Sequence, residues 1–285
     1  MPRVSYVNGQ FVPHSEAAVH VEDRGYQFSD GVYEVWGIAR GRLIDLELHL
    51  DRLERSLGEL RIDAPMSRAA LTLLLKEMVR RNRLKNGMVY LQISRGVAPR
   101  DHAFPTSPVA PALIITARPL SPNFYDSKVA SGIKVITVPD QRWARPDIKS
   151  VSLLGNVLAI QAARDVGADD AWQVDGEGFV TESSRSNAWI VDSDGNLITR
   201  KADNAILNGI TRRVIIGLAE KEGRKIIERP FTVDEAKAAR EAFQTSASAY
   251  VLPVVEIDGQ PVANGRPGSV ATGVRETYMN SSLGA

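Results

Sequence analysis

A stretch with two prolines and no hydrophobic periodicity, residues 118–126, divides this chain into two parts. With 285 residues the chain is long for one hydrophobic core, since domains usually have roughly 100–200 residues. Domain boundaries fall in irregular, proline-containing segments of this kind. We therefore predict an N-terminal α+β domain over residues 1–120 and a C-terminal domain over residues 125–285.

The N-terminal part shows short strand patterns and two helix patterns. Asn8-Gly9 lies between short alternating runs, which is typical of a hairpin. Leucines recur at helical spacing from Leu46 to Leu60, and Ser67 is a suitable N-cap for a second helix. Further strands are predicted over 33–38, 88–94 and 112–117. Residues 96–111 are rich in proline and polar residues and are expected to form a loop.

The C-terminal part mixes strands and helices without regular βαβ alternation. Strand patterns at 133–138 and 171–174 flank a helix pattern that Gly167 can close. Another helix is expected to begin at Thr211, and hairpins are expected at the end of the chain, around Asp258-Gly259. This mixture indicates the α+β class with two domains.

Composition excludes several classes of protein. A net charge of +1 indicates neither nucleic acid nor an anionic membrane as a partner. The absence of cysteine excludes disulfides, thiolate nucleophiles and cysteine-based metal sites. The four histidines show no metal-ligand spacing, so no metal is expected. No signal peptide and no membrane-spanning apolar run of roughly 18–20 residues is present, so we expect a cytoplasmic location.

Lys149 is the first candidate for chemistry. It follows a strand pattern and an arginine-containing stretch, and it directly precedes an apolar helix pattern. A partly desolvated lysine near other cations is the kind of amine that forms a Schiff base with a carbonyl. Most lysines, however, are solvated surface charges, so Lys149 alone decides nothing.

Two other segments indicate a functional site only when they are considered together with Lys149. Gly209-Ile210-Thr211 opens an apolar helix, where free backbone N–H groups and a hydroxyl can bind phosphate. An ordinary helix start has the same appearance. Glu182 lies in a polar segment between two strand patterns and, taken alone, belongs to a polar turn.

Together, four motifs resemble the fold-type IV pyridoxal-phosphate enzymes. The resemblance covers nearly the whole chain, with the motifs in the same order and at similar spacing. The motifs are residues 22–34 (EDRGYQFSDGVYE), 147–150 (DIKS), 180–182 (VTE) with Ser186-Asn187, and 207–212 (LNGITR). The resemblance implies a two-domain α+β fold with pyridoxal 5'-phosphate in the cleft between the domains.

The resemblance implies a role for each matching residue. Lys149 would carry the cofactor as a Schiff base and move the proton between the substrate α-carbon and the cofactor. Glu182 would pair with the pyridine nitrogen, because an ionised carboxylate keeps that nitrogen protonated. Arg52 would bind the phosphate bidentately. Ile210 and Thr211 would add a backbone N–H and a hydroxyl.

Two serines complete the implied cofactor site, Ser186 and Ser246. Near the second of them the chain departs from the family pattern, since Ala247 stands where a hydroxyl residue contributes to the phosphate cup. Ser246 or Ser248 could take its place. Arg185 is also unusual, because it lies where a D-amino-acid transaminase has a run of serines.

The loop over 96–111 is similar to that of D-amino-acid transaminases. In that family an arginine and a histidine two residues later bind the substrate α-carboxylate, and Arg100 and His102 match them. There the loop reaches the neighbouring subunit's site and works with a tyrosine that matches Tyr33, so a homodimer is implied. The implied reaction is ping-pong transfer of an amino group between a D-amino acid, such as D-alanine, and a 2-oxo acid, such as 2-oxoglutarate.

Other enzymes of the same fold are the alternatives. Branched-chain L-amino-acid aminotransferases, (R)-amine transaminases and aminodeoxychorismate lyases share the cofactor residues, and the loop with Arg100 and His102 argues against each of them. A non-catalytic protein that only binds the cofactor is expected to have lost its lysine or its glutamate. This chain keeps both Lys149 and Glu182.

Overall fold

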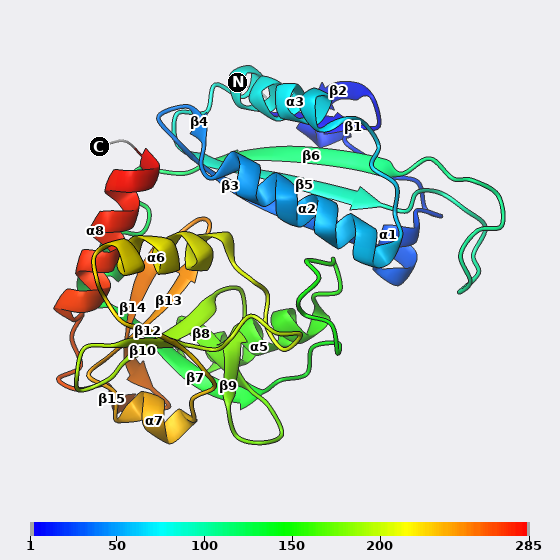
Figure 1. The fold of residues 1–285 in the computed structure, drawn as a ribbon. Helices are drawn as coiled ribbons and strands as arrows, with labels where there is room; N and C mark the ends of the chain where they lie inside the picture. The colour runs from blue at the N-terminus through cyan, green and yellow to red at the C-terminus, as the bar shows by residue number, and fades with distance from the viewer. Residues whose placement is uncertain (1–2, 284–285) are drawn as a thin grey trace. The chain divides into compact units, whose positions relative to one another are not determined.

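The computed structural model describes residues 3–283, and the chain divides into two compact units (Figure 1). Unit 1 contains residues 1–122 and 148–152, and unit 2 contains residues 123–147 and 153–285. Each unit has its own sheet and its own hydrophobic core. The α+β class predicted from the sequence is confirmed.

Unit 1 is built on an antiparallel sheet with the strand order β2-β1-β6-β5-β3-β4. Its strands are β1 (Val4–Val7), β2 (Gln10–Pro13), β3 (Gly31–Ala39), β4 (Arg42–Leu43), β5 (Gly87–Ser94) and β6 (Ala112–Pro119). Its helices are the 3₁₀ turn η1 (His14–Glu16), α1 (Arg24–Phe28), α2 (Leu46–Leu60) and α3 (Arg68–Arg81). The predicted Asn8-Gly9 hairpin joins β1 to β2, and both turn residues have positive φ.

Helices α2 and α3 lie along one face of this sheet (Figure 1). The leucine spacing explains the packing of α2, because Leu50, Leu53 and Leu57 share one helix face and are buried in the core. On the sheet, Val89, Leu91 and Ile93 of β5 point to the same core, as alternation along a strand requires. Burial of these two faces against each other holds unit 1 together.

A five-residue segment from farther along the chain joins unit 1. Ile148 packs into its core, and the backbone of residues 149–151 pairs with β3. The Tyr33 amide donates to the Lys149 carbonyl (2.9 Å), and the Val151 amide donates to the Gly31 carbonyl (3.0 Å). Lys149 is thereby fixed beside β3.

Unit 2 contains a mixed sheet with the strand order β12-β11-β10-β13-β14-β7-β8-β9, and β15 pairs with β14. Its strands are β7 (Ile133–Pro139), β8 (Asp170–Val174), β9 (Val180–Ser183), β10 (Asn187–Val191), β11 (Leu197–Thr199), β12 (Ile226–Glu228), β13 (Glu241–Ser246), β14 (Tyr250–Ile257) and β15 (Gln260–Pro261). Its helices are α4 (Asp126–Ser131), α5 (Leu154–Asp165), α6 (Ile210–Lys221), α7 (Val233–Lys237) and α8 (Ser269–Leu283).

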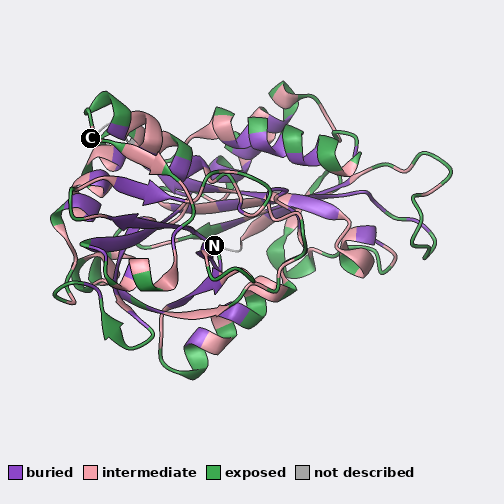
Figure 2. Ribbon diagram, turned by 60° about the horizontal axis from the view of Figure 1, so that its bottom comes forward, coloured by how far each residue is buried: buried purple, intermediate pink, exposed green. Residues whose placement is uncertain are grey.

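Both faces of the unit 2 sheet are covered. Along β13, Ala242 belongs to one hydrophobic cluster and Phe243 to another, so successive residues enter different cores. This accounts for strands that are buried along almost their whole length, drawn in purple in Figure 2. The motifs at Glu182 and Asn187 are therefore set in rigid, well-packed strands.

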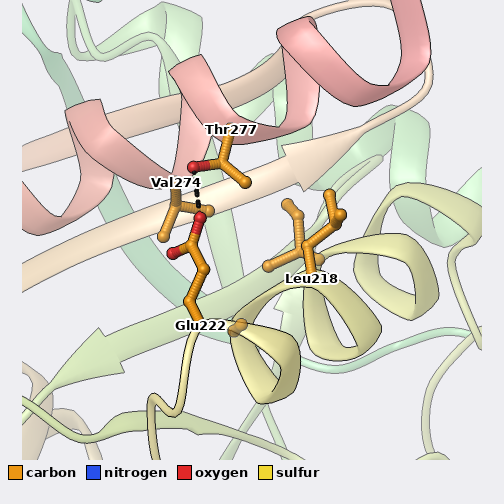
Figure 3. Close-up of a pocket in the computed structure, with 6 residues that line it drawn as sticks. Leu218, Glu222, Val274 and Thr277 are labelled. Carbon is orange, nitrogen blue, oxygen red and sulfur yellow. Dashed lines mark hydrogen bonds between the residues drawn. The ribbon is translucent and has the colours of Figure 1, made fainter.

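The long C-terminal helix α8 was not predicted from the sequence. Its first turn is capped from another element, because the Glu241 carboxylate accepts from the amides of Val270 (3.0 Å) and Ala271 (2.8 Å). Beside α6 it forms a small hollow, at which the Thr277 hydroxyl donates to Glu222 (2.8 Å; Figure 3). None of the described helices is long and apolar enough to cross a membrane.

Candidate active site

Lys149 lies beside an aromatic ring in unit 1. Its Nζ is 4.1 Å from the centre of the Tyr33 ring, and Tyr33 stacks on Tyr90 with 5.6 Å between the ring centres. The Lys149 amide donates to the Ser56 hydroxyl (3.4 Å), which adds a link to α2. Within residues 3–283, the Lys149 amino group forms no ion pair with a carboxylate. A half-buried amine without a carboxylate partner can react with a carbonyl group once it has lost its proton.

A buried carboxylate, Glu34, organises the charges next to this lysine. Its Oε1 accepts from Arg52 Nε (2.7 Å), and its Oε2 lies 2.8 Å from Arg52 Nη2 and 2.7 Å from His49 Nδ1. Burial would raise the pKa of Glu34, but the charge and hydrogen bonds of Arg52, together with His49, lower that pKa to about 2. Burial lowers the pKa of His49. Glu34 raises this pKa, but Arg52 and Lys149 lower it further, so that it stays below its ordinary value. The glutamate is therefore ionised and the histidine neutral at pH 7.

This cluster predicts a loss of stability in acid. The pKa of Glu34 is lower in the folded protein (about 2) than its ordinary value of 4.5, so its stabilisation is complete above pH 4.5 and lost as the pH falls toward 2. The lowered pKa of His49 acts in the same direction below its ordinary value of 6.5. We expect Glu34→Gln to reduce the free energy of unfolding at pH 7 by about 3 kcal/mol, with the difference vanishing near pH 2. Urea titrations from pH 2 to 7 measure this.

Glu16→Gln, at an exposed position in η1, is the control and should leave the pH profile unchanged. Parallel stability curves for Glu34→Gln and the unmodified protein over this whole range would contradict the interpretation.

The position of Arg52 restricts how it can bind an anion. The guanidinium edge formed by Nε and Nη2 is occupied by Glu34. Glu34 therefore fixes the plane and direction of Arg52, because a paired guanidinium cannot rotate without breaking two charged hydrogen bonds.

In unit 2, the Glu182 carboxylate is surrounded by donors. Glu182 is buried on β9 and accepts from Asn187 Nδ2 (3.1 Å), from the Leu207 amide (3.1 Å) and, through Oε1, from Arg142 Nη1. Donors around a carboxylate favour its ionised form. Glu182 is thus a fixed negative charge in a buried setting.

Arg142 extends this network. Its guanidinium also binds Asp140 (Nη2 to Oδ2, 2.6 Å), and Asp140 accepts from the Thr181 hydroxyl (2.8 Å). Burial would raise the pKa of Asp140, but Arg142 and Thr181 lower it. Asp140, Arg142 and Glu182 together carry one net negative charge, which suits a cationic group beside Glu182.

The start of α6 offers backbone donors to an anion. Its N-cap is Gly209, which has no side chain that could accept from the first-turn amides. A Cβ on Gly209 would lie 2.1 Å from Asn187 Oδ1, so the close approach of Asn187 requires glycine here. The first-turn amides of Ile210 and Thr211 therefore remain available to an anion, as at other helix N-termini.

The two predicted serines lie in unit 2, at the ends of strands. Ser186 is buried in the turn between β9 and β10, where its carbonyl accepts from the Ser183 amide (2.7 Å). Ser246 ends β13, and its hydroxyl accepts from the Ala249 amide (3.4 Å). The Ser248 hydroxyl accepts from Tyr125 (3.4 Å), so both serines that could compensate for Ala247 have local partners.

The loop with Arg100 and His102 joins β5 to β6 and is largely exposed (Figures 1 and 2). Both side chains lie against Phe28: the Arg100 guanidinium carbon is 5.1 Å from the ring centre, and the His102 ring is 5.4 Å away. Among the described residues, Tyr33 makes ring contacts with Tyr90 and Lys149 and none with Arg100 or His102.

The predicted residues thus fall into separate groups. The structure brings Lys149 together with Tyr33, and Arg100 together with His102. Unit 1 contains these four and Arg52, whereas the remaining cofactor residues, Glu182, Ser186, Ile210, Thr211 and Ser246, belong to unit 2.

Sequence reasoning gave no role to Glu34, His49, Arg142 or Asn187. Glu34 and Asn187 stand within the quoted motifs, so their position was a usable signal. His49 and Arg142 lie outside the motifs, and only the folded chain shows what they bind.

Comparison with known proteins identifies a family. Residues 31–257 match the family described as Amino-transferase class IV. The D-alanine aminotransferase of Staphylococcus haemolyticus is 41% identical over 273 residues, which are 96% of this chain and 95% of that protein. The D-alanine aminotransferase of Listeria monocytogenes is 41% identical over 281 residues, covering 98% of this chain and 96% of that protein.

Solved structures agree on the fold. The branched-chain aminotransferase of the archaeon Thermoproteus uzoniensis, solved with norvaline, has a TM-score of 0.88 and 26% identity over 100% of this chain and 96% of that one. Another branched-chain amino acid aminotransferase, solved with pyridoxamine 5'-phosphate, has a TM-score of 0.90 and 27% identity over 100% of this chain and 95% of that one. The resemblance inferred from the four motifs is confirmed: this chain belongs to the class IV aminotransferase family.

Proposed function

We propose that this chain is a pyridoxal-phosphate-dependent aminotransferase that transfers an amino group between a D-amino acid, such as D-alanine, and a 2-oxo acid, such as 2-oxoglutarate. The observation that carries this proposal is the setting of Lys149, whose amino group lies on the Tyr33 ring without a carboxylate partner among the described residues. The identity of 41% to D-alanine aminotransferases over nearly the whole chain supports the substrate class.

The residues present fit the cofactor. Bound pyridoxal phosphate supplies a ring that accepts electrons from the substrate α-carbon. Lys149 would hold it covalently and then move the proton at that carbon. Glu182 would face the ring nitrogen, and its donors keep the carboxylate ionised for that purpose. The uncapped amides of Ile210 and Thr211, with Arg52, would take the phosphate.

Attachment of the cofactor to Lys149 can be checked directly. Borohydride reduction of the protein with bound pyridoxal phosphate, followed by peptide mass spectrometry, should find the added mass on the peptide that contains Lys149. The mass on another lysine would refute this assignment.

Arg100 and His102 would bind the substrate α-carboxylate. A cation held on one side of the cofactor selects which face of the substrate presents its α-hydrogen to Lys149, and so selects the D or the L form. As part of the same proposal, the enzyme is a cytoplasmic homodimer in which this loop serves the site of the other subunit. Sedimentation should then give twice the mass of one chain.

Replacement of Arg100 tests the carboxylate role. We expect Arg100→Gln to raise the KM for D-alanine about tenfold or more with little change in kcat, because a charged hydrogen bond to the substrate is lost. Steady-state kinetics with D-alanine and 2-oxoglutarate measure this. Arg80→Gln is the control, since Arg80 is 71% exposed on α3. An unchanged KM in Arg100→Gln means that the carboxylate is bound elsewhere.

A branched-chain L-amino-acid aminotransferase is the second candidate, favoured by the likeness to the solved branched-chain enzymes. The loop with Arg100 and His102 favours a D-amino-acid substrate instead. Turnover of L-leucine or L-valine faster than of any D-amino acid would reverse this choice.

A further inference from the structure

The loop over residues 96–111, here called the carboxylate loop, has little internal structure of its own. It contains no helix or strand, and Arg100, Asp101 and His102 are exposed. A loop of this kind samples many conformations unless other elements restrain it. Two side chains that are to bind one carboxylate need a fixed spacing, so the restraint on this loop matters for binding.

A buried charge cluster lies at the base of the loop. The Asp30 carboxylate accepts from Arg24 Nε (2.8 Å) and from Arg95, through Nε (2.7 Å) and Nη2 (3.0 Å). Arg24 is only 3% exposed and Arg95 only 9%. Burial would raise the pKa of Asp30, but the hydrogen bonds from Arg95 and Arg24 lower it, so the carboxylate holds both guanidinium groups at pH 7.

Arg24 reaches from this cluster into the carboxylate loop. Its Nη1 donates to the Asp101 carbonyl (2.6 Å), and its Nη2 lies 3.5 Å from the His102 carbonyl. These carbonyls belong to the backbone that leads from Arg100 to His102. One buried guanidinium thus joins Asp30 to the part of the loop that carries both carboxylate-binding side chains.

Arg95 supports the other end of the cluster. It donates to the carbonyls of Leu60 (2.8 Å) and Arg61 (2.8 Å) at the end of α2, and its guanidinium carbon lies 3.8 Å from the centre of the Phe104 ring. The cluster therefore connects the loop to α2, a helix of the core, and this connection restrains the loop.

The short helix α1 completes the support. The Arg24 amide donates to the Gly96 carbonyl (2.9 Å), and the Arg95 amide donates to the Asp30 carbonyl (3.0 Å). Phe28, at the end of α1, contacts Arg24, Arg100 and His102 with its ring. The segment before β3 and the carboxylate loop are thus one bonded structure.

We propose that Arg24, held by Asp30 beside Arg95, is a positioning residue that fixes the carboxylate loop and thereby the substrate-carboxylate site formed by Arg100 and His102. This inference rests on the proposed function. Arg24 does not touch the substrate. It acts through the backbone carbonyls of Asp101 and His102.

The test variant is Arg24→Lys. Lysine keeps a positive charge beside Asp30, but its single nitrogen cannot bind Asp30 and both carbonyls as the planar guanidinium does. We expect faster amide hydrogen exchange over residues 97–106, with exchange in α2 and β5 unchanged. We also expect the KM for D-alanine to rise about tenfold while kcat stays within about twofold, as loss of charged hydrogen bonds predicts. The matched control is Arg68→Lys, since Arg68 pairs with carboxylates on an exposed surface of the same unit.

A double-mutant cycle separates positioning from direct binding. If Arg24 acts through Arg100 and His102, Arg24→Lys should raise the KM of Arg100→Gln by less than it raises the KM of the unmodified enzyme, because the Arg100 interaction is already lost there. A full additional tenfold increase would overturn the proposal, and so would unchanged exchange and KM in Arg24→Lys when Arg100→Gln raises KM. An unchanged KM in Arg100→Gln itself would instead refute the proposed carboxylate role.

Arg95→Lys is the second variant, should Arg24→Lys not fold. It keeps a charge beside Asp30 but loses the fork that also reaches Leu60 and Arg61. The same two measurements should move in the same direction, and no change in either would overturn the proposal.

Discussion

Lys149→Ala should lower aminotransferase turnover about 10⁴-fold or more while the fold stays intact, because the proposed covalent attachment point and the proposed proton-transferring base are both lost. Lys149 lies half-buried at the edge of β3, where its backbone carbonyl accepts from Tyr33. Alanine keeps that backbone bond and removes only the amine. Single-turnover kinetics with D-alanine, together with circular dichroism, separate loss of chemistry from loss of structure.

Lys76→Ala is the matched control for this result. Lys76 is exposed on α3 of the same unit, and its replacement should leave turnover unchanged. A Lys149→Ala enzyme with nearly normal rates would exclude Lys149 as the reacting amine. The setting of Lys149 would then no longer support the proposed function.

Glu182→Gln should lower kcat about 10²–10³-fold, the effect typical of removing one preorganised charge from an active site. Glutamine has the same shape and can still accept from Asn187 and Leu207, but it carries no negative charge to keep the ring nitrogen protonated. The cofactor should stay attached to Lys149, so borohydride labelling should persist while turnover falls.

Glu177→Gln, at an exposed position in the turn between β8 and β9, should change neither measurement. If Glu182→Gln kept full turnover, the ring nitrogen would have another partner. The network of Asp140 and Arg142 would then have no demonstrated part in the chemistry.

Elements with a strong periodic pattern were predictable from the sequence. The leucine spacing in α2 and the glycine before α6 gave helices close to their observed bounds. The turn between β10 and β11 is equally local, because Asp192 accepts from the amides of Asp194 and Asn196. In each case the signal lies within a few neighbouring residues.

Other elements depend on distant partners and were missed. Helix α8 has a weak apolar face of Val270, Ala271, Val274 and Tyr278, and Glu241 of β13 caps it. The pairing of residues 149–151 with β3 was likewise not anticipated, because the sequence assigned all of 125–285 to the second domain. No local pattern carries that information.

The motifs indicated which residues belong to the candidate site but not which hydrogen bonds fix their positions. Glu34, His49 and Arg52 are charged or polar residues, which are usually expected on the surface. They are buried here because they form hydrogen bonds with one another. Arg24 binds the carbonyl of Asp101, which is 77 residues away in the sequence. Such bonds need the folded chain, because the partners lie on elements that the sequence does not relate.

The most direct test of the proposed function is stereochemical. The purified protein with pyridoxal phosphate and 2-oxoglutarate should be given D-alanine or L-alanine in parallel, and pyruvate should be followed in both. Pyruvate from D-alanine alone is the predicted result, and it would support both the transferase activity and the role of Arg100 and His102. Pyruvate from L-alanine alone, or from neither, would contradict the proposed D-amino-acid transferase activity.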